Sequence, residues 1–441
     1  MTLLNIPEKT KLGNYWLLLA ILALAGSGLL SIIIVLLRTP GINSLIPATW
    51  FKLSLVVHVD LSVLVWLLAM TAVLVAPVIT LYKLSKTALY FAGTGMLLIL
   101  LSPIFGGEPI LNNYVPMLHN FVFVLGLSCF IAGIILQLIC ANIRSEHNFL
   151  ITSLARQLGL IMLAAVVAFV WSKHQLTSYM QETYVVLADY YELVFWGFGH
   201  ILQFIFTQIM MQAWWYLTPF KPNTRDQYSD IWKTNLWLNA VLGCSVILLM
   251  PFYNIDSYEF QMLFTNQMRY VGGIAPVIAV IILGYAGYRK HFNFKKWPER
   301  YFWLASQILF WFGGVLAWMI IEVNVVIPAH YHGNIIGVSI ALMGLAVQKV
   351  RQTQPKIGSD KLIKLQPIII TVGQILHITG LAVSGGYGAL RKTPGEVASA
   401  KAKMAMGMMG GGGMLAVIGG IMLVVWFYQN RLMWLVTPQS N

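Results

Sequence analysis

Charged side chains are scarce in this chain. Asp, Glu, Lys and Arg make up only 10% of its 441 residues, whereas hydrophobic residues make up 58%. A typical soluble domain carries about 25% charged residues. This composition excludes an ordinary water-soluble protein and predicts a chain that lies in the lipid bilayer.

Cysteine is also scarce, and its placement excludes two kinds of site. Cys129, Cys140 and Cys244 all fall in apolar runs, and no two of them form a C-x-x-C pair. We therefore expect neither a disulfide nor a thiolate metal site. The sequence also has no C-x-x-C-H haem-attachment motif and no cysteine-rich copper domain, so electron input from cytochrome c would need a partner subunit.

Apolar runs of membrane-spanning length are abundant instead. A helix needs roughly 20 apolar residues to cross a bilayer. The first run has no small-residue cleavage pattern after it, so we expect a span there and not a signal peptide. We predict 12 membrane-spanning helices, near residues 15–37, 51–82, 88–105, 116–143, 154–171, 184–217, 231–253, 270–288, 301–326, 329–347, 367–387 and 404–426.

The basic residues predict the orientation of these spans. The net charge is +13, and most of the 28 Lys and Arg residues fall in loops on one side of the predicted bundle. This asymmetry follows the positive-inside rule, places both termini in the cytoplasm and explains the charge without nucleic acid binding. We expect an integral protein of a bacterial inner membrane or a comparable energy-coupling membrane.

Two histidines open the tenth predicted span. His330 and His332 are two residues apart, in the sequence Ala329-His330-Tyr331-His332-Gly333. Positions i and i+2 of a helix lie about 200° apart, so the two side chains point to opposite sides. One helix can thus hold two flat cofactors, because histidine is a common axial ligand of haem iron. For the pair alone, two ordinary interfacial histidines are an equally good interpretation.

Two further histidines lie inside predicted spans. His58 is in the outer part of the second span, and His200 follows Trp196-Gly197-Phe198-Gly199 near the middle of the sixth. An ionisable side chain inside the membrane suggests a functional site, with a hydrogen bond to a neighbouring helix as the alternative. The glycines would let backbone or a planar ligand approach closely. By contrast, we expect His119 at the membrane rim and His147, His174 and His291 in water.

Other polar positions have two interpretations each. Glu192 lies about two turns outward from His200, where it could relay protons or make a structural hydrogen bond. Arg391 and Lys392 form a basic pair after the eleventh span that could bind carboxylates or remain solvated. Glu322 and Asn324 could bind a propionate network or an ion. Met404–Met414, rich in methionine and glycine, is explained by close helix packing better than by metal binding.

The arrangement as a whole resembles subunit I of the haem-copper oxidase superfamily, which includes the cytochrome oxidases and nitric oxide reductases. The resemblance rests on the 12 spans and the histidine positions described above, together with the glycine-rich exit and basic pair after the eleventh span. It implies an all-α bundle and two b- or a-type haems. The implied ligands are His58 and His332 for a low-spin haem, His330 for a high-spin haem, Arg391 and Lys392 for the propionates, and His200 for a second metal, copper or iron.

The chain departs from this pattern at the second metal. The superfamily places a His-His pair near the outer end of the seventh span, whereas this chain has Pro251-Phe252-Tyr253-Asn254. Phe204, four residues after His200, replaces a tyrosine found in many oxidases. One imidazole does not hold copper, because a metal site needs several ligands in fixed geometry. The resemblance therefore implies the haem ligands and an incomplete copper site.

The resulting expectation is a respiratory oxidoreductase built as one transmembrane haem-binding domain, residues 1–441. Electrons from cytochrome c, quinol or a partner subunit would pass from the low-spin to the high-spin haem and reduce oxygen or nitric oxide. His377 is a candidate quinol contact. The alternatives are a non-catalytic haem redox, sensor or assembly subunit without copper, and a 12-span secondary transporter, although no internal repeat supports the latter.

Overall fold

The structure is a computed structural model of the whole chain. It describes residues 11–39, 47, 49–143, 149–294, 297, 299–320, 325–353, 360–386 and 400–430. Within these residues, 12 helical segments are long and apolar enough to cross a membrane, from Lys11–Arg38 to Ala400–Gln429. The predicted fold class and the number of spans are therefore confirmed, and the chain is an integral membrane protein.

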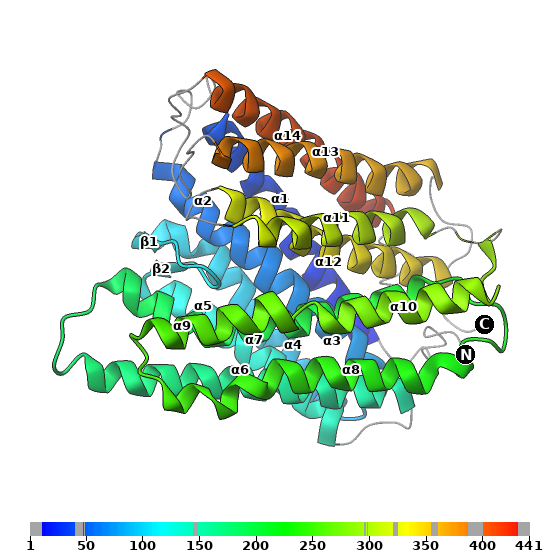
Figure 1. Cartoon of the computed structure of the whole chain (residues 1–441), viewed down its shortest axis with the longest axis horizontal. Helices are drawn as coiled ribbons and strands as arrows, with labels where there is room; N and C mark the ends of the chain where they lie inside the picture. Colours follow the sequence, from blue (N-terminus) through cyan, green and yellow to red (C-terminus); the bar gives the residue numbers. More distant parts are fainter. Residues whose placement is uncertain are drawn as a thin grey trace. The chain divides into compact units, whose positions relative to one another are not determined.

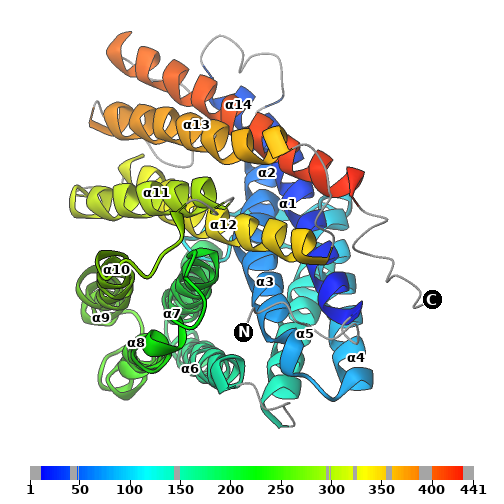
Figure 2. The ribbon, with the colours of Figure 1, turned by 90° about the vertical axis from the view of Figure 1, so that its right-hand side faces the viewer.

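The helices divide into two compact units, which are drawn in Figures 1 and 2. The first unit comprises Met1–Leu67 and Trp297–Asn441, and the second comprises Leu68–Lys296. The first contains α1 (Lys11–Arg38), α2 (Thr49–Val59), α11 (Arg300–Trp318), α12 (Val326–Thr353), α13 (Asp360–Gly386) and α14 (Ala400–Gln429). The second contains α4 (Tyr82–Leu101), α5 (Phe121–Ile143), α6 (Phe149–Tyr179), α7 (Leu187–Leu217), α8 (Ser229–Cys244), α9 (Tyr258–Asn266) and α10 (Ile274–Tyr288).

The second predicted span is not a uniform α-helix. A π-helical turn, Asp60–Val65, separates α2 from α3 (Trp66–Val75), and it begins two residues after His58. A π turn inserts one residue into the helix and often occurs at a functional site. Asp60 is buried in this turn, and neither of its carboxylate oxygens has a hydrogen-bond partner among the described residues.

Glycines bring α13 and α14 into close contact along their length, and both views show the two helices side by side (Figures 1 and 2). A Cβ at Gly373 would lie 2.5 Å from the backbone nitrogen of Ala416, and one at Gly380 would lie 2.5 Å from the carbonyl oxygen of Ala405. Small residues permit such approach between membrane helices. The close packing expected from the Met404–Met414 sequence is confirmed.

A short β-hairpin precedes α5 and was not predicted. β1 (Glu108–Ile110) pairs antiparallel with β2 (Met117–His119), so Met117–His119 is a strand and the fourth span begins at Phe121, not at Pro116. His119 is exposed, as expected for a rim residue.

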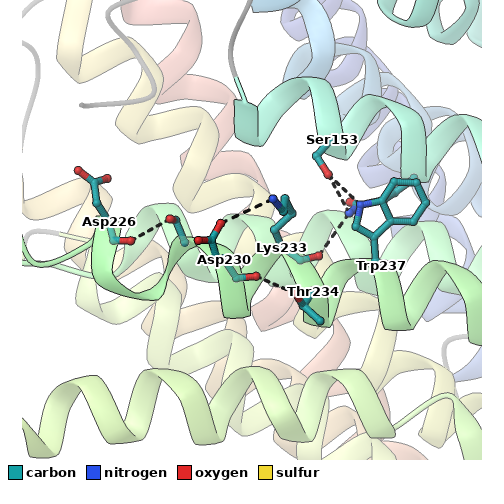
Figure 3. A network of polar contacts seen from close by, with 8 residues as sticks. Ser153, Asp226, Asp230, Lys233, Thr234 and Trp237 are labelled. Carbon is teal, nitrogen blue, oxygen red and sulfur yellow. Dashed lines mark hydrogen bonds and ion pairs between the residues drawn. The ribbon is translucent and has the colours of Figure 1, made fainter.

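Buried amide side chains connect the helices of the second unit. Gln208 on α7 donates from Nε2 to Gln157 Oε1 on α6 at 2.8 Å, and its own Oε1 accepts from Asn239 Nδ2 on α8 at 2.7 Å. Figure 3 shows another link between α6 and α8, where Trp237 Nε1 donates to Ser153 Oγ at 3.0 Å. Side-chain hydrogen bonds of this kind hold membrane helices together.

This network predicts a stability effect. Gln208→Leu removes the bonds to Gln157 and Asn239 and leaves buried amide groups without partners, so we expect the free energy of unfolding to fall by about 1–3 kcal/mol. The measurement is unfolding of the detergent-solubilised protein followed by circular dichroism. Gln203→Leu on the same helix is the control, because Gln203 is half-buried and makes one long bond of 3.4 Å. Equal stability of the two variants would contradict a stabilising network.

Candidate functional site

His58 is held from α1 in a way that leaves one ring nitrogen free. Its Nδ1 lies 3.0 Å from the backbone oxygen of Ser27 and 2.9 Å from Ser27 Oγ, and the same hydroxyl donates to the carbonyl of His58 at 3.2 Å. Nδ1 therefore carries the proton, and Nε2 has no hydrogen-bond partner among the described residues. A histidine that ligates a metal is typically fixed in this manner through its other nitrogen.

His330 shows the same pattern on α12. Its Nδ1 donates to the carbonyl oxygen of Gly313 on α11 at 2.8 Å, and Nε2 has no partner within the described part of the chain. The bond is short because α11 and α12 nearly touch there: a Cβ at Gly333 would lie 2.7 Å from the nitrogen of Gly313. Glycine at both positions therefore sets the orientation of the imidazole.

His332 faces a different neighbour from His330. Its ring contacts that of His377 on α13, with centroids 4.5 Å apart and planes at 56°. His330 thus contacts α11, and His332 contacts α13, so the two side chains leave α12 toward different helices. Nδ1 of His332 is buried and has no hydrogen-bond partner among the described residues.

Three basic groups lie around His332 in the first unit. His58, His377 and Arg38 all lie close enough to His332 to act on it electrostatically. Arg38 ends α1, is buried, and stacks on the ring of Phe51 with its guanidinium carbon 5.3 Å from the centroid. The structure therefore brings together the two histidines that the resemblance assigns to one haem.

These features fit haem ligation in the first unit. His58 and His330 each present an unbonded Nε2 behind a fixed Nδ1, whereas the buried Nδ1 of His332 has no partner among the described residues. Haem iron is commonly held by imidazole nitrogens of this kind. Arg391 and Lys392, the residues assigned to the propionates, lie outside the described residues, as do Glu322 and Asn324.

His200 in the second unit is different, because both of its ring nitrogens are engaged. Nδ1 lies 2.7 Å from the carbonyl oxygen of Trp196, and Nε2 lies 2.8 Å from the hydroxyl of Tyr114. Nδ1 therefore carries the proton, and Nε2 accepts a hydrogen bond from the tyrosine. The imidazole is buried and packs against the rings of Trp196, Tyr114 and Phe264.

Tyr114 belongs to the hairpin segment, residues 108–119, and two more contacts fasten that segment to α7. Glu192 accepts hydrogen bonds from the backbone and the side-chain amide of Asn113, the former at 2.9 Å. His119 Nδ1 lies 3.1 Å from the hydroxyl of Tyr191. The structural role weighed for Glu192 is thus the one that its contacts support.

The glycines of the Trp-Gly-Phe-Gly-His sequence accommodate aromatic side chains of the protein itself. A Cβ at Gly199 would overlap the ring of Tyr114, and one at Gly197 would lie 2.9 Å from Cζ of Phe264. The expected close approach is therefore present, but it serves tyrosine and phenylalanine side chains in the second unit.

A second metal does not fit the residues around His200. A ligand must offer a lone pair to the metal, and both nitrogens of this imidazole are used in hydrogen bonds. Across the described ranges, no group of three or more His, Cys, Asp or Glu side chains is arranged to hold a metal ion. Ligation by His200 would require Tyr114 to move away and other ligands to approach.

The remaining histidines divide between exposed and bonded positions. His174 lies on α6 and is exposed, as expected. His291 was expected to be solvated, but it is half-buried and bonds through Nδ1 to the hydroxyl of Tyr228 at 2.9 Å. His377 is only 7% exposed, so its position does not support contact with a quinol in the bilayer. His147 lies outside the described residues.

No sequence pattern marks several of the residues that contact these histidines. Ser27 lies in an apolar span, Gly313 offers only a carbonyl, and Tyr114 is 86 positions from His200. The polar sequence Asn112-Asn113-Tyr114 just before the fourth span was the one available hint. Periodicity along one helix does not reveal which loop packs against it.

The Tyr114 contact predicts a change in local opening. Tyr114→Phe removes a hydrogen bond worth about 0.5–1.5 kcal/mol, so amides of residues 108–119 should exchange with deuterium roughly 3- to 10-fold faster. Tyr90→Phe on the exposed face of α4 is the control. Unchanged exchange in the hairpin segment would show that Tyr114 does not hold it.

The chain is similar in sequence to two bacterial proteins and similar in fold to a solved structure. No family model matches the chain. The chain is 34% identical over 490 residues to the uncharacterized protein RP382 of Rickettsia prowazekii, covering 95% of this chain and 96% of that protein. It is 26% identical over 365 residues to an uncharacterized protein of Aquifex aeolicus, covering 80% of this chain and 89% of the relative.

Among solved structures, the chain resembles a haem-copper terminal oxidase determined as a dimer. The TM-score is 0.66 at 17% sequence identity, and the match covers 98% of this chain and 85% of the other. The likeness extends over essentially the whole chain and confirms the architecture that the spans and histidines predicted. The chain has the fold of a haem-copper terminal oxidase subunit, and it belongs to the family of the uncharacterized protein RP382 of Rickettsia prowazekii.

Proposed function

We propose that the chain is a membrane haem oxidoreductase that transfers electrons from a low-spin haem, bound by His58 and His332, to a high-spin haem bound by His330. The substrate of the second haem would be oxygen or nitric oxide. The chain would act as one transmembrane haem-binding domain, with Arg391 and Lys392 holding propionates and a separate donor, such as cytochrome c, quinol or a partner subunit, supplying electrons.

The observation that carries this proposal is the hydrogen-bond arrangement that His58 and His330 have in common. In each, a backbone oxygen on a neighbouring helix fixes Nδ1, at 3.0 Å from Ser27 and 2.8 Å from Gly313, and leaves Nε2 free. Both histidines are half-buried and lie in different spans, and an imidazole fixed through Nδ1 with Nε2 unbonded is the arrangement typical of a metal ligand.

The chemistry would come from haem, which supplies one-electron redox change and, where one axial position is open, a site for a diatomic gas. The residues of the chain would bind and orient it. α12 presents His330 and His332 to opposite sides, so one rigid helix would position both ligands. Ser27 and Gly313 would keep Nδ1 of His58 and of His330 protonated and thereby direct Nε2 to iron.

A second candidate is a non-catalytic haem redox, sensor or assembly subunit. It is favoured by one observation, the engagement of both nitrogens of His200 by Trp196 and Tyr114. Without the second metal, complete reduction of oxygen would lack the partner metal that the oxidases use. Loss of turnover with retention of the two haems would be the expected behaviour of such a protein.

Gas consumption by the purified protein separates the two candidates. The protein is reduced with ascorbate and a soluble mediator, and oxygen or nitric oxide uptake is followed with an electrode, with boiled protein and free haem as controls. Uptake that disappears in His330→Ala supports the oxidoreductase. Uptake no greater than that of free haem, in protein that still carries both haems, supports the non-catalytic subunit.

A further inference from the structure

His377 on α13 is a buried histidine that the proposed haem sites do not use. Its Nδ1 lies 2.9 Å from the carbonyl oxygen of Met409 on α14, which fixes the ring, and only 7% of the residue is exposed. Nε2 has no hydrogen-bond partner among the described residues. One face of the ring contacts His332 at a centroid separation of 4.5 Å.

The surface of α14 is shaped to receive this ring. A Cβ at Gly413 would lie 3.0 Å from Nδ1 of His377 and 2.9 Å from Cγ2 of Val35, and a Cβ at Gly412 would overlap the backbone nitrogen of His377. Both glycines are buried, whereas Gly411 beside them is exposed and has nothing within 4 Å. Gly412 and Gly413 therefore leave space for His377 against α14, in addition to permitting close helix packing.

His332 lacks the backbone anchor that fixes the other two histidines, and its polar side-chain neighbour on α13 besides His377 is Gln374. A ligating histidine is ordinarily oriented through its second nitrogen, as His58 is by Ser27 and His330 is by Gly313. Nδ1 of His332 is buried and has no partner within the described residues. The aromatic contact that can define its ring plane is the one with the ring of His377.

We propose that His377 is a positioning residue that sets the ring plane of His332 through a relay of contacts from α14. Met409 and Gly413 place His377, and His377 places His332. This inference rests on the proposed function, because it treats His332 as an axial ligand of the low-spin haem. It adds a residue that the resemblance does not assign, and it gives the α14 glycines a role in the site.

The expected consequence is a change in the electronic structure of the haem without loss of the haem. The angle between two axial imidazole planes governs the splitting of the iron d orbitals and hence the g-values of the oxidised low-spin haem. Without the contact to His377, the imidazole of His332 would adopt a broader range of angles relative to the imidazole of His58. The low-spin signal should therefore shift and broaden, and the midpoint potential of that haem should move with it.

The test uses electron paramagnetic resonance and redox titration of the purified full-length protein carrying its haems. His377→Leu removes the supporting ring, and Gly413→Ala displaces it by crowding Nδ1. We expect both variants to shift the low-spin g-values and the potential and to keep the carbon monoxide spectrum of the other haem. His377→Phe keeps a ring at this position but loses the Nδ1 bond. Its g-values should therefore lie between those of the wild-type protein and those of His377→Leu.

Gly411→Ala is the matched control on the same helix and should leave both spectra unchanged. Variants with wild-type g-values and potential, in protein that holds both haems, would overturn the positioning role. If His377→Leu loses the low-spin haem altogether, the shift in Gly413→Ala decides the question. Wild-type protein that purifies without haem would refute the proposed function itself, which is a different and recognisable result.

Discussion

His332→Ala is expected to abolish the low-spin haem spectrum and leave the carbon-monoxide-binding haem in place, while His330→Ala does the reverse. Each variant should retain about half of the haem of the wild-type protein, because the proposed assignment gives the two rings to different irons. Haem content by the pyridine haemochrome method and optical spectra with and without carbon monoxide measure the effect.

The independence of the two losses follows from the contacts of each ring. His330 is fixed by Gly313 on α11, and His332 packs on His377 of α13. Removal of either imidazole leaves the supports of the other intact. His58→Ala should reproduce the His332→Ala spectrum, since both would ligate the same iron.

The control for these variants is His174→Ala on α6, an exposed histidine at the surface of the second unit. It should keep both haems. The same spectral loss from His330→Ala and His332→Ala would contradict the assignment of the two histidines to different haems, as would a low-spin spectrum that survives His332→Ala.

His200→Ala is expected to leave haem content and metal content unchanged, which is the opposite of its effect in a protein with a second metal. In this chain the imidazole accepts from Tyr114 and donates to Trp196. Its removal frees the hydroxyl of Tyr114 and loosens the hairpin segment. We expect no stoichiometric copper in the wild-type protein and the same iron content, within error, in the variant.

Metal analysis by mass spectrometry on both proteins measures this prediction directly. Tyr114→Phe serves as the companion variant, since it removes the hydrogen bond to Nε2 and keeps the imidazole. Copper at about one atom per wild-type chain that disappears in His200→Ala would mean that Tyr114 moves aside and that His200 ligates a metal after all.

Much of the architecture follows from the sequence, because it depends on local pattern. The length of the apolar runs predicts the 12 spans. The two-residue spacing of His330 and His332 predicts opposite directions on one helix, and in the structure the two side chains contact different helices, α11 and α13. Errors occur at boundaries: the fifth predicted span, residues 154–171, is part of the longer helix Phe149–Tyr179.

The partners of the site residues could not be predicted, because they come from distant parts of the chain. Tyr114 lies in a loop whose fold depends on Glu192 and Tyr191 of α7, and no periodicity marks that contact. His377 packs against glycines of α14 and contacts His332 of α12, so its surroundings come from two other helices. Such contacts depend on tertiary packing, which a single sequence pattern does not encode.

The most direct test of the central claim is an optical spectrum of the purified protein, taken oxidised, reduced, and reduced with carbon monoxide, with iron and copper quantified on the same sample. We expect two haems per chain, one of which binds carbon monoxide, and no stoichiometric copper. Protein without haem, or two haems accompanied by one copper per chain, would contradict it.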